Sequence, residues 1–137
     1  MSGRNVNETK VICSDLFQLA ATIYFPNQDI KGAVLIAPAT GIKRQFYGNF
    51  ATYLSENGYG VITFDNRGIG QSLLETLDNS EVSLQCWGEK DLPAALEKLK
   101  QAFPNTRYHL VGHSAGGQLV GLMPNAKELN SIFNFAC

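Results

Sequence analysis

The chain has 137 residues, of which 45% are hydrophobic and 17% are charged, as expected for one globular domain and not for a disordered protein. Eleven basic residues against twelve acidic residues leave a formal charge of −1, which argues against a nucleic-acid-binding protein. No apolar run is long enough to span a bilayer, and the polar N-terminus is unlike a secretory signal. Three widely spaced cysteines (Cys13, Cys86 and Cys137) favour reduced thiols in a cytosolic protein, and the sequence indicates no metal site and no cofactor.

The first third of the chain predicts three strands, at residues 11–14, 17–25 and 33–37. The third strand is apolar at every position, which is typical of a parallel strand covered on both faces. A helix is then predicted over residues 45–57, with Gly58 as its stop. Side chains at spacings of three and four are expected to form one buried stripe on this helix, namely Phe46, Phe50, Tyr53, Leu54 and Asn57.

The rest of the chain continues the alternation of strands and helices. Residues 61–64 predict a buried strand, and a long polar loop follows as far as about residue 88. The next helix is predicted to begin near Asp91 as its N-cap, with Pro93 in its first turn. Its expected buried face consists of Leu92, Ala95, Leu96, Leu99 and Phe103. The remaining predicted elements are a strand at 108–112, a helix at 116–123 and a strand at 131–135. This rhythm predicts an α/β fold, in which right-handed crossovers put helices on both faces of a parallel sheet.

A G-x-S-x-G motif, formed by Gly112, Ser114 and Gly116, lies between a predicted strand and a predicted helix. This context is typical of a nucleophile elbow, in which the serine sits on a strained turn and larger flanking residues would collide with neighbouring elements. The helix that follows directs its N-terminal NH groups at the site and so favours developing negative charge. The alternative is a tight turn whose serine only caps the helix.

A glycine-rich loop follows the strand predicted at 61–64, and it contains Asp65, Arg67, Gly68 and Gly70. It leaves the carboxyl end of that strand, which is the end where open α/β sheets hold ligands. We favour a structural role for Asp65 and Arg67, whose charge-assisted hydrogen bonds would hold the loop. Direct contact with substrate is the alternative.

Together these segments resemble the α/β-hydrolase superfamily, and within it bacterial predicted hydrolases of the serine-aminopeptidase and lysophospholipase-like type. The resemblance spans nearly the whole chain and is carried by residues 38–41, Phe46-Tyr47, Phe50-Ala51, Phe64-Asp65, residues 67–70, Ser72, Trp87-Gly88, residues 91–95 and residues 112–124. It implies a three-layer αβα sandwich with a mostly parallel sheet. About six strands are expected here, in the order 1-2-4-3-5-6 and with strand 2 antiparallel.

The same resemblance implies a serine hydrolase. Ser114 would be the nucleophile, and the backbone NH groups of Thr40 and Ala115 would form the oxyanion hole. Each such NH group is worth about 3–4 kcal/mol to the oxyanion of an acyl-transfer intermediate. The substrate would be a small ester, thioester or amide, cleaved through an acyl-Ser114 intermediate. For the segment that holds Thr40, an ordinary turn rich in Pro and Gly is the alternative.

The acid and the base of the expected triad have no counterpart after Ser114. In this fold the order along the chain is serine, acid, histidine. Residues 115–137 hold one acid, Glu128, and no histidine. His113 lies next to Ser114 in a turn that points neighbouring side chains apart, and His109 is expected to be a core or edge histidine. A serine without a base is a poor nucleophile.

We therefore expect residues 1–137 to be the N-terminal part of a single α/β-hydrolase domain, without the lid and the last strands, and inactive in isolation. The competing hypothesis is a non-catalytic, degenerate or truncated member of the fold that acts by binding or self-association. A truncated sheet would leave the C-terminal strand at 131–135 as an unprotected edge, and we then expect a homodimer through edge pairing or exchange of segments. A nucleotide-binding domain is disfavoured because neither G-x-G-x-x-G nor G-x-x-x-x-G-K-[ST] occurs.

Overall fold

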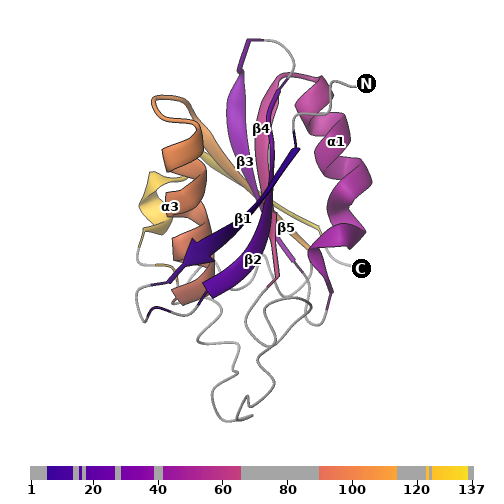
Figure 1. Ribbon diagram of the computed structural model, residues 1–137. Coiled ribbons are helices and arrows are strands. Elements are labelled where there is room, and N and C mark those ends of the chain that lie inside the picture. Colours follow the sequence, from indigo (N-terminus) through magenta and orange to yellow (C-terminus); the bar gives the residue numbers. More distant parts are fainter. Residues whose placement is uncertain are drawn as a thin grey trace.

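The computed structural model describes residues 6–13, 16, 18–26, 29–38, 42–65, 90–113, 123 and 125–135. In this part of the chain, one sheet lies between helices (Figure 1). Its strands are β1 (Val6–Ile12), β2 (Gln18–Tyr24), β3 (Gly32–Ala37), β4 (Tyr59–Phe64), β5 (Tyr108–His113) and β6 (Ser131–Phe135). The helices are η1 (Arg44–Tyr47), α1 (Gly48–Glu56), α3 (Leu92–Ala102) and η6 (Ala126–Glu128). None of these helices combines the length and the apolar character that crossing a membrane requires.

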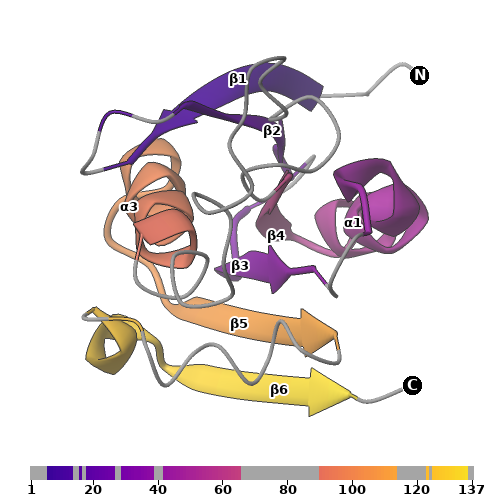
Figure 2. The ribbon, with the colours of Figure 1, turned by 90° about the horizontal axis from the view of Figure 1, so that it is seen from below.

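The strand order is β1-β2-β4-β3-β5-β6, as expected. Strand β2 is antiparallel to both β1 and β4, whereas β3 is parallel to β4 and β5, and β5 is parallel to β6. The crossover from β3 to β4 and the crossover that carries α3 from β4 to β5 run in opposite directions across the sheet. Right-handed connections therefore put α1 and α3 on opposite faces (Figure 2). The three-layer αβα sandwich with a mostly parallel sheet is confirmed.

Several predicted boundaries hold and one strand was placed wrongly. The strand at 131–135 is confirmed as β6, and the central strands β2, β3, β4 and β5 differ from the predicted ranges by one or two residues at their ends. The first strand was expected at 11–14, but β1 begins at Val6 and pairs along its whole length with β2. The reason is that β1 is an outer strand with one buried side chain, Val11, so its apolar signal is weak. The helix expected at 116–123 lies outside the described residues, except for Met123, which is buried.

The buried face of α1 differs from the predicted stripe. Phe46, in η1, and Tyr53 were expected inside, but they are 66% and 61% exposed, and Phe50 and Asn57 are also exposed. Of the expected stripe, Leu54 is partly buried against the core. The face that packs on the sheet instead carries Tyr47 and Ala51, both buried. Because Ala51 is small, the helix axis can approach the sheet closely at that point, which large aromatic side chains would prevent. After the helix, Gly58 adopts a φ of 95°, as predicted for a glycine stop.

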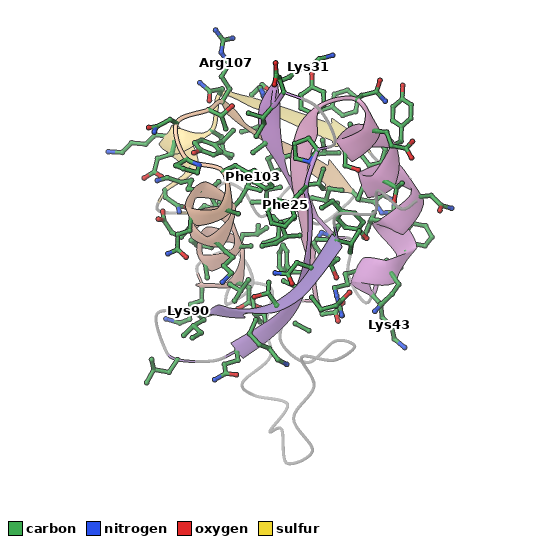
Figure 3. The ribbon with its side chains drawn as sticks, turned by 45° about the horizontal axis from the view of Figure 1, so that its top comes forward. Phe25, Lys31, Lys43, Lys90, Phe103 and Arg107 are labelled. Atoms are coloured by element: carbon green, nitrogen blue, oxygen red, sulfur yellow. The ribbon has the colours of Figure 1, made fainter. Side chains whose placement is uncertain are left out.

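The core on the opposite face follows the prediction. All five expected side chains are buried, namely Leu92, Ala95, Leu96 and Leu99 in α3 and Phe103 directly after it. The Phe103 ring lies beside that of Phe25, with centroids 5.2 Å apart (Figure 3). The same ring also lies against the backbone of Gly60 in β4, where a Cβ atom would come within 2.5 Å of it. Gly60 is therefore a position at which the core has no room for a side chain.

Asp91 does not act as the predicted N-cap. It occupies that position with helical backbone angles, and within the described residues its side chain makes no capping hydrogen bond to the first turn of α3. Its carboxylate instead accepts a long hydrogen bond from the thiol of Cys13, at 3.6 Å between Sγ and Oδ1. Cys13 is buried and is not part of a disulfide. The buried thiol and the buried carboxylate thus partner each other across 78 residues of sequence.

Candidate active site

The carboxyl ends of β3, β4 and β5 meet at one edge of the sheet, where the expected catalytic segments leave it. Ala37, at the end of β3, pairs with Gly112 of β5. The turn expected to carry the first oxyanion donor and the expected nucleophile elbow therefore leave neighbouring parallel strands at the same level. Thr40, Ser114, Ala115, Gly116, Arg67, Gly68 and Gly70 lie outside the described residues. Of the predicted site residues, Asp65 and Gly112 are described, and both are buried.

Asp65 forms an ion pair and hydrogen bonds with Arg44, the first residue of η1. The Arg44 backbone NH donates to Oδ1 of Asp65 at 2.7 Å, and its Nη1 donates to Oδ2 at 2.6 Å. Both side chains are almost completely buried. Charge-assisted bonds of this kind are stronger and more directional than neutral ones. The ion pair ties the segment after β3 to the end of β4, an arrangement that favours the structural interpretation of Asp65.

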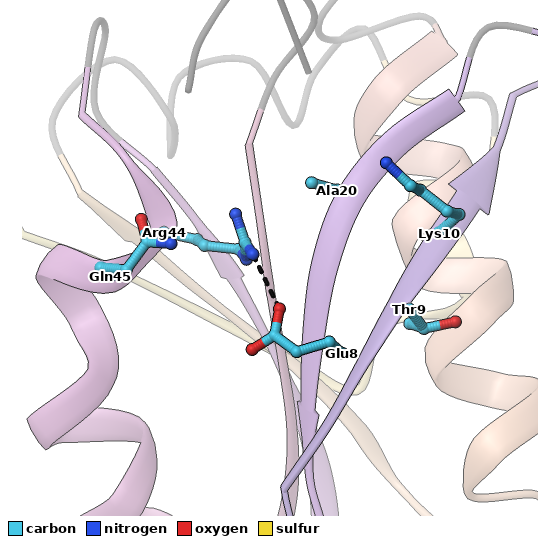
Figure 4. A pocket seen from close by; sticks show the side chains of 6 residues that line it. All are labelled: Glu8, Thr9, Lys10, Ala20, Arg44 and Gln45. Carbon is cyan, nitrogen blue, oxygen red and sulfur yellow. Dashed lines mark hydrogen bonds and ion pairs between the residues drawn. The ribbon is translucent and has the colours of Figure 1, made fainter. Parts of the chain in front are cut away.

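Arg44 also reaches strands β1 and β2 of the sheet. Its Nε donates to the Thr22 hydroxyl of β2 at 2.9 Å, and its Nη2 donates to Oε1 of Glu8 in β1 at 2.7 Å (Figure 4). Glu8 in turn accepts a hydrogen bond from Thr22. A cavity of about 780 Å³, lined in part by Lys10 and Ala20, opens beside the ion pair between Arg44 and Glu8. Three segments distant in sequence are thereby joined through one guanidinium group.

The ion pair makes the contribution of Glu8 to stability depend on pH. The hydrogen bond from Arg44 lowers the pKa of Glu8 below its usual value of 4.5, although partial burial opposes this effect. The folded state therefore gains stability from ionised Glu8 above that usual pKa, and the gain disappears as the pH falls through the lower folded value.

We expect Glu8→Gln to be less stable than the wild type at pH 7, by no more than about 1 kcal/mol, because the carboxylate is largely exposed. Urea unfolding at a series of pH values should show that the difference shrinks as the pH falls from the usual pKa of 4.5 through the lower folded pKa, and that it vanishes once Glu8 is protonated in the folded state as well. A difference that stays constant down to pH 3 would contradict the assignment.

The end of β5 is held by a second residue of η1. The hydroxyl of buried Tyr47 lies 2.9 Å from Nδ1 of His113, the last residue of β5, in a hydrogen bond. The Tyr47 and His113 rings meet edge to face, with centroids 5.7 Å apart and planes at 82°. On another side, the Phe46 ring lies parallel to the imidazole, with planes 4° apart and centroids at 6.1 Å. The His113 side chain is thus fixed by contacts from η1.

His109, the other histidine of the chain, lies further back along β5. Its Nδ1 is 2.6 Å from the Ser131 hydroxyl of β6, in a hydrogen bond. Burial lowers the pKa of His109, and the positive charge of Arg107 lowers it further. It lies four residues before His113 and pairs in register with Val34 in the middle of β3. This position is away from the carboxyl edge where the expected nucleophile segment begins.

Sequence reasoning missed Arg44 and Tyr47 as members of this site. An arginine beside Lys43 at the start of a helix has the pattern of a solvated surface residue, so nothing local indicated its burial. Tyr47 was noted within the Phe46-Tyr47 pair, but its partner His113 is 66 residues away. The sheet order brings these residues together, and no short motif records that order.

The fold is similar to solved structures of esterases. A carboxyl esterase from Bacillus coagulans has a TM-score of 0.77 at 19% identity, with 94% of this chain and 43% of the esterase covered. The Pyrococcus furiosus esterase Pf2001 has a TM-score of 0.76 at 20% identity, with 94% of this chain and 50% of the esterase covered. At such identities the likeness shows the fold alone. The chain spans half or less of the length of these structures.

Two further likenesses are in sequence. Protein phosphatase methylesterase 1 of Candida albicans is 26% identical over 99 residues, which make up 72% of this chain and 26% of that protein. The model of the family described as serine aminopeptidase, S33, matches residues 28–128, well over half of the chain. The match includes both the segment after β3 and the G-x-S-x-G motif. By this match and by its strand order, the chain belongs to the S33 serine aminopeptidase family within the α/β-hydrolase superfamily.

Proposed function

We propose that the chain carries the nucleophile and the oxyanion hole of an acyl hydrolase. Ser114 is the proposed nucleophile, and the backbone NH groups of Thr40 and Ala115 are the proposed oxyanion donors. The observation that carries the proposal is the pairing of Ala37 with Gly112, since the two segments in question follow these paired residues. The family match over both segments supports the same roles.

The proposed reaction follows from these roles. The Ser114 hydroxyl oxygen adds to the carbonyl carbon of an ester, thioester or amide, while the two NH groups stabilise the oxyanion. Collapse of this intermediate breaks the bond to the leaving group, which takes up the proton lost by Ser114 and departs as the alcohol, thiol or amine. The acyl-Ser114 that remains is hydrolysed by water, which releases the acid and restores the hydroxyl. The relatives include a carboxyl esterase and a methylesterase on one side and a family of aminopeptidases on the other. We therefore propose small carboxylic esters, thioesters and amides as the substrate class and do not narrow it further.

We further propose that residues 1–137 on their own react slowly at Ser114. A base must remove the serine proton, and neither histidine of the chain is arranged for that task. Nδ1 of His113 is bound to Tyr47, and His109 is bonded to Ser131 away from the edge. An oxyanion hole without a complete triad still leaves a residual rate enhancement of about 10³–10⁴ over water. The expected reactivity is thus weak but specific.

A fluorophosphonate probe tests this proposal. The Ser114 oxygen displaces fluoride from phosphorus and its proton leaves to solvent, so the adduct marks the nucleophile covalently. We expect slow labelling that peptide mass spectrometry locates at Ser114 and that Ser114→Ala abolishes. Labelling within seconds would contradict the proposed low reactivity of the chain. An adduct confined to another residue would contradict the role of Ser114.

Self-association is the second candidate function, and the exposure of β6 favours it. In the described sheet β6 is an outer strand, and its Ile132 and Phe133 side chains are 49% and 64% exposed. Outer strands with exposed apolar side chains pair readily with another chain. We propose that a second copy pairs at this edge.

Light scattering at increasing protein concentration should show a dimer, and Ile132→Lys should shift the protein toward monomer because it places a charge in the paired edge. The exposed Lys127 offers a matched control, since Lys127→Ala lies outside the strand and should leave the dimer intact. A clean monomer for the wild type at the highest concentration would rule out this mode of association.

A further inference from the structure

The contact between η1 and the end of β5 bears directly on the residue that precedes Ser114. Tyr47 is buried and belongs to the segment that follows the expected oxyanion turn. His113 is the last residue of β5, so its backbone is the point from which the chain continues to Ser114. Tyr47 and His113 are joined by the 2.9 Å hydrogen bond between the hydroxyl and Nδ1. The contact between Tyr47 and His113 therefore joins the two sides of the proposed site.

The surroundings of the His113 ring restrict it to one orientation. The Tyr47 ring packs against it edge to face, and the Phe46 ring lies parallel to it. A ring held by a directional hydrogen bond and by two aromatic neighbours cannot change rotamer without losing all three contacts. Fixing the side chain of residue 113 also restricts the backbone at the start of the elbow, where small displacements of a reacting atom are costly.

We propose that Tyr47 is a positioning residue for Ser114 and acts through His113. The inference rests on the proposed role of Ser114. The phenolic hydroxyl donates to Nδ1, because its oxygen shares its lone pairs with the ring and is a better donor than acceptor. His113 then carries its proton on Nε2. In this tautomer the bonded nitrogen is unavailable as a proton acceptor, so His113 orients the elbow and does not serve as its base.

Nitrogen NMR tests the hydrogen bond without any need for activity. The chain has two histidines, so protein labelled with ¹⁵N in histidine gives two ring spin systems, which a His109→Gln variant assigns. At alkaline pH, where histidine rings are neutral, we expect His113 as a single Nε2–H tautomer. Tyr47→Phe should shift its ring nitrogens toward the average of the two tautomers and leave His109 unchanged. Tyr53→Phe, at the exposed tyrosine of α1, is the matched control and should change neither ring.

The rate of fluorophosphonate labelling tests the positioning role. We expect Tyr47→Phe to slow the labelling of Ser114 by about ten-fold, a loss typical of a small displacement of the reacting atom. His113→Leu should slow it to a similar extent, whereas His113→Asn should retain much of the rate, because the Asn carbonyl can accept from Tyr47. The double variant Tyr47→Phe/His113→Leu should be no slower than either single variant, since both remove the same link.

Three results would overturn the inference. The first is a His113 spectrum that shows the Nδ1–H tautomer or does not respond to Tyr47→Phe. The second is an unchanged labelling rate in Tyr47→Phe while the wild type reacts at Ser114, which would leave the proposed function standing. The third is a double variant whose slowing equals the product of the single effects, because that would mean that Tyr47 acts independently of His113. If the wild type forms no adduct at Ser114, the proposed function itself fails, and the positioning role fails with it.

Discussion

Arg44→Met is expected to lower the free energy of unfolding by about 3–5 kcal/mol, the range for removal of one partner from a buried ion pair. The reason is that Asp65 would remain buried without the guanidinium that lies 2.6 Å from its Oδ2 atom. The bonds of Arg44 to Thr22 and Glu8 would be lost as well. For a domain whose total stability is about 5–15 kcal/mol, this is a large fraction.

Urea denaturation followed by circular dichroism measures the effect of Arg44→Met. Lys43→Met at the neighbouring exposed position is the matched control and should change stability by less than about 0.5 kcal/mol. Adding Asp65→Asn to Arg44→Met should recover part of the loss, because no uncompensated charge then stays buried. A double variant whose loss equals the sum of the two single losses would contradict the coupling between these side chains.

Gly60→Ala is expected to lower the free energy of unfolding by about 1–3 kcal/mol, the usual cost of forcing extra volume into a packed core. The added Cβ would lie 2.5 Å from two atoms of the Phe103 ring. This ring cannot easily move away, because it is buried and packs beside Phe25. Either the ring or strand β4 must shift to admit a single methyl group.

The control for this variant is Gly48→Ala at the start of α1. There the added Cβ would make an ordinary contact at 3.6 Å, and the backbone is already helical, so alanine should be neutral or stabilising. Phe103→Leu in the Gly60→Ala background should cost less than Phe103→Leu in the wild type, because the smaller side chain relieves the clash. Equal costs in the two backgrounds would show that Phe103 is not what excludes a side chain at Gly60.

The buried face of a helix was predictable where the local spacing of apolar residues allows only one such face. The apolar positions of α3 are unambiguous, since Leu92, Leu96 and Leu99 have no competing stripe on the same helix. Across η1 and α1, two stripes one residue apart both fit a helical period. Hydrophobicity favoured the one with Phe46 and Phe50, but close approach of the helix to the sheet selected Ala51. The size of a side chain at the point of closest approach decided the rotation, and an apolar pattern does not contain that information.

The candidate site was predictable only where its residues lie beside a strand end. Gly112 and Asp65 follow from the rule that ligands bind at the carboxyl edge of a parallel sheet. The burial of Arg44 was not predicted because its partners are distant in sequence. Asp65 lies 21 residues after it and Glu8 lies 36 residues before it. Arg44 is buried because β1, β2 and the end of β4 come together there through the strand order. Such contacts depend on the assembled sheet and leave no signature in a local segment.

We propose that this chain supplies the serine side of an acyl-transfer site and that neither of its two histidines serves as the base. Adding imidazole during fluorophosphonate labelling tests this most directly, because free imidazole can accept the Ser114 proton as the oxygen attacks phosphorus. We expect the rate of adduct formation at Ser114 to rise in proportion to the concentration of neutral imidazole and to be zero in Ser114→Ala. Rapid labelling of Ser114 that does not depend on imidazole would contradict it, as would no adduct at Ser114 at any imidazole concentration.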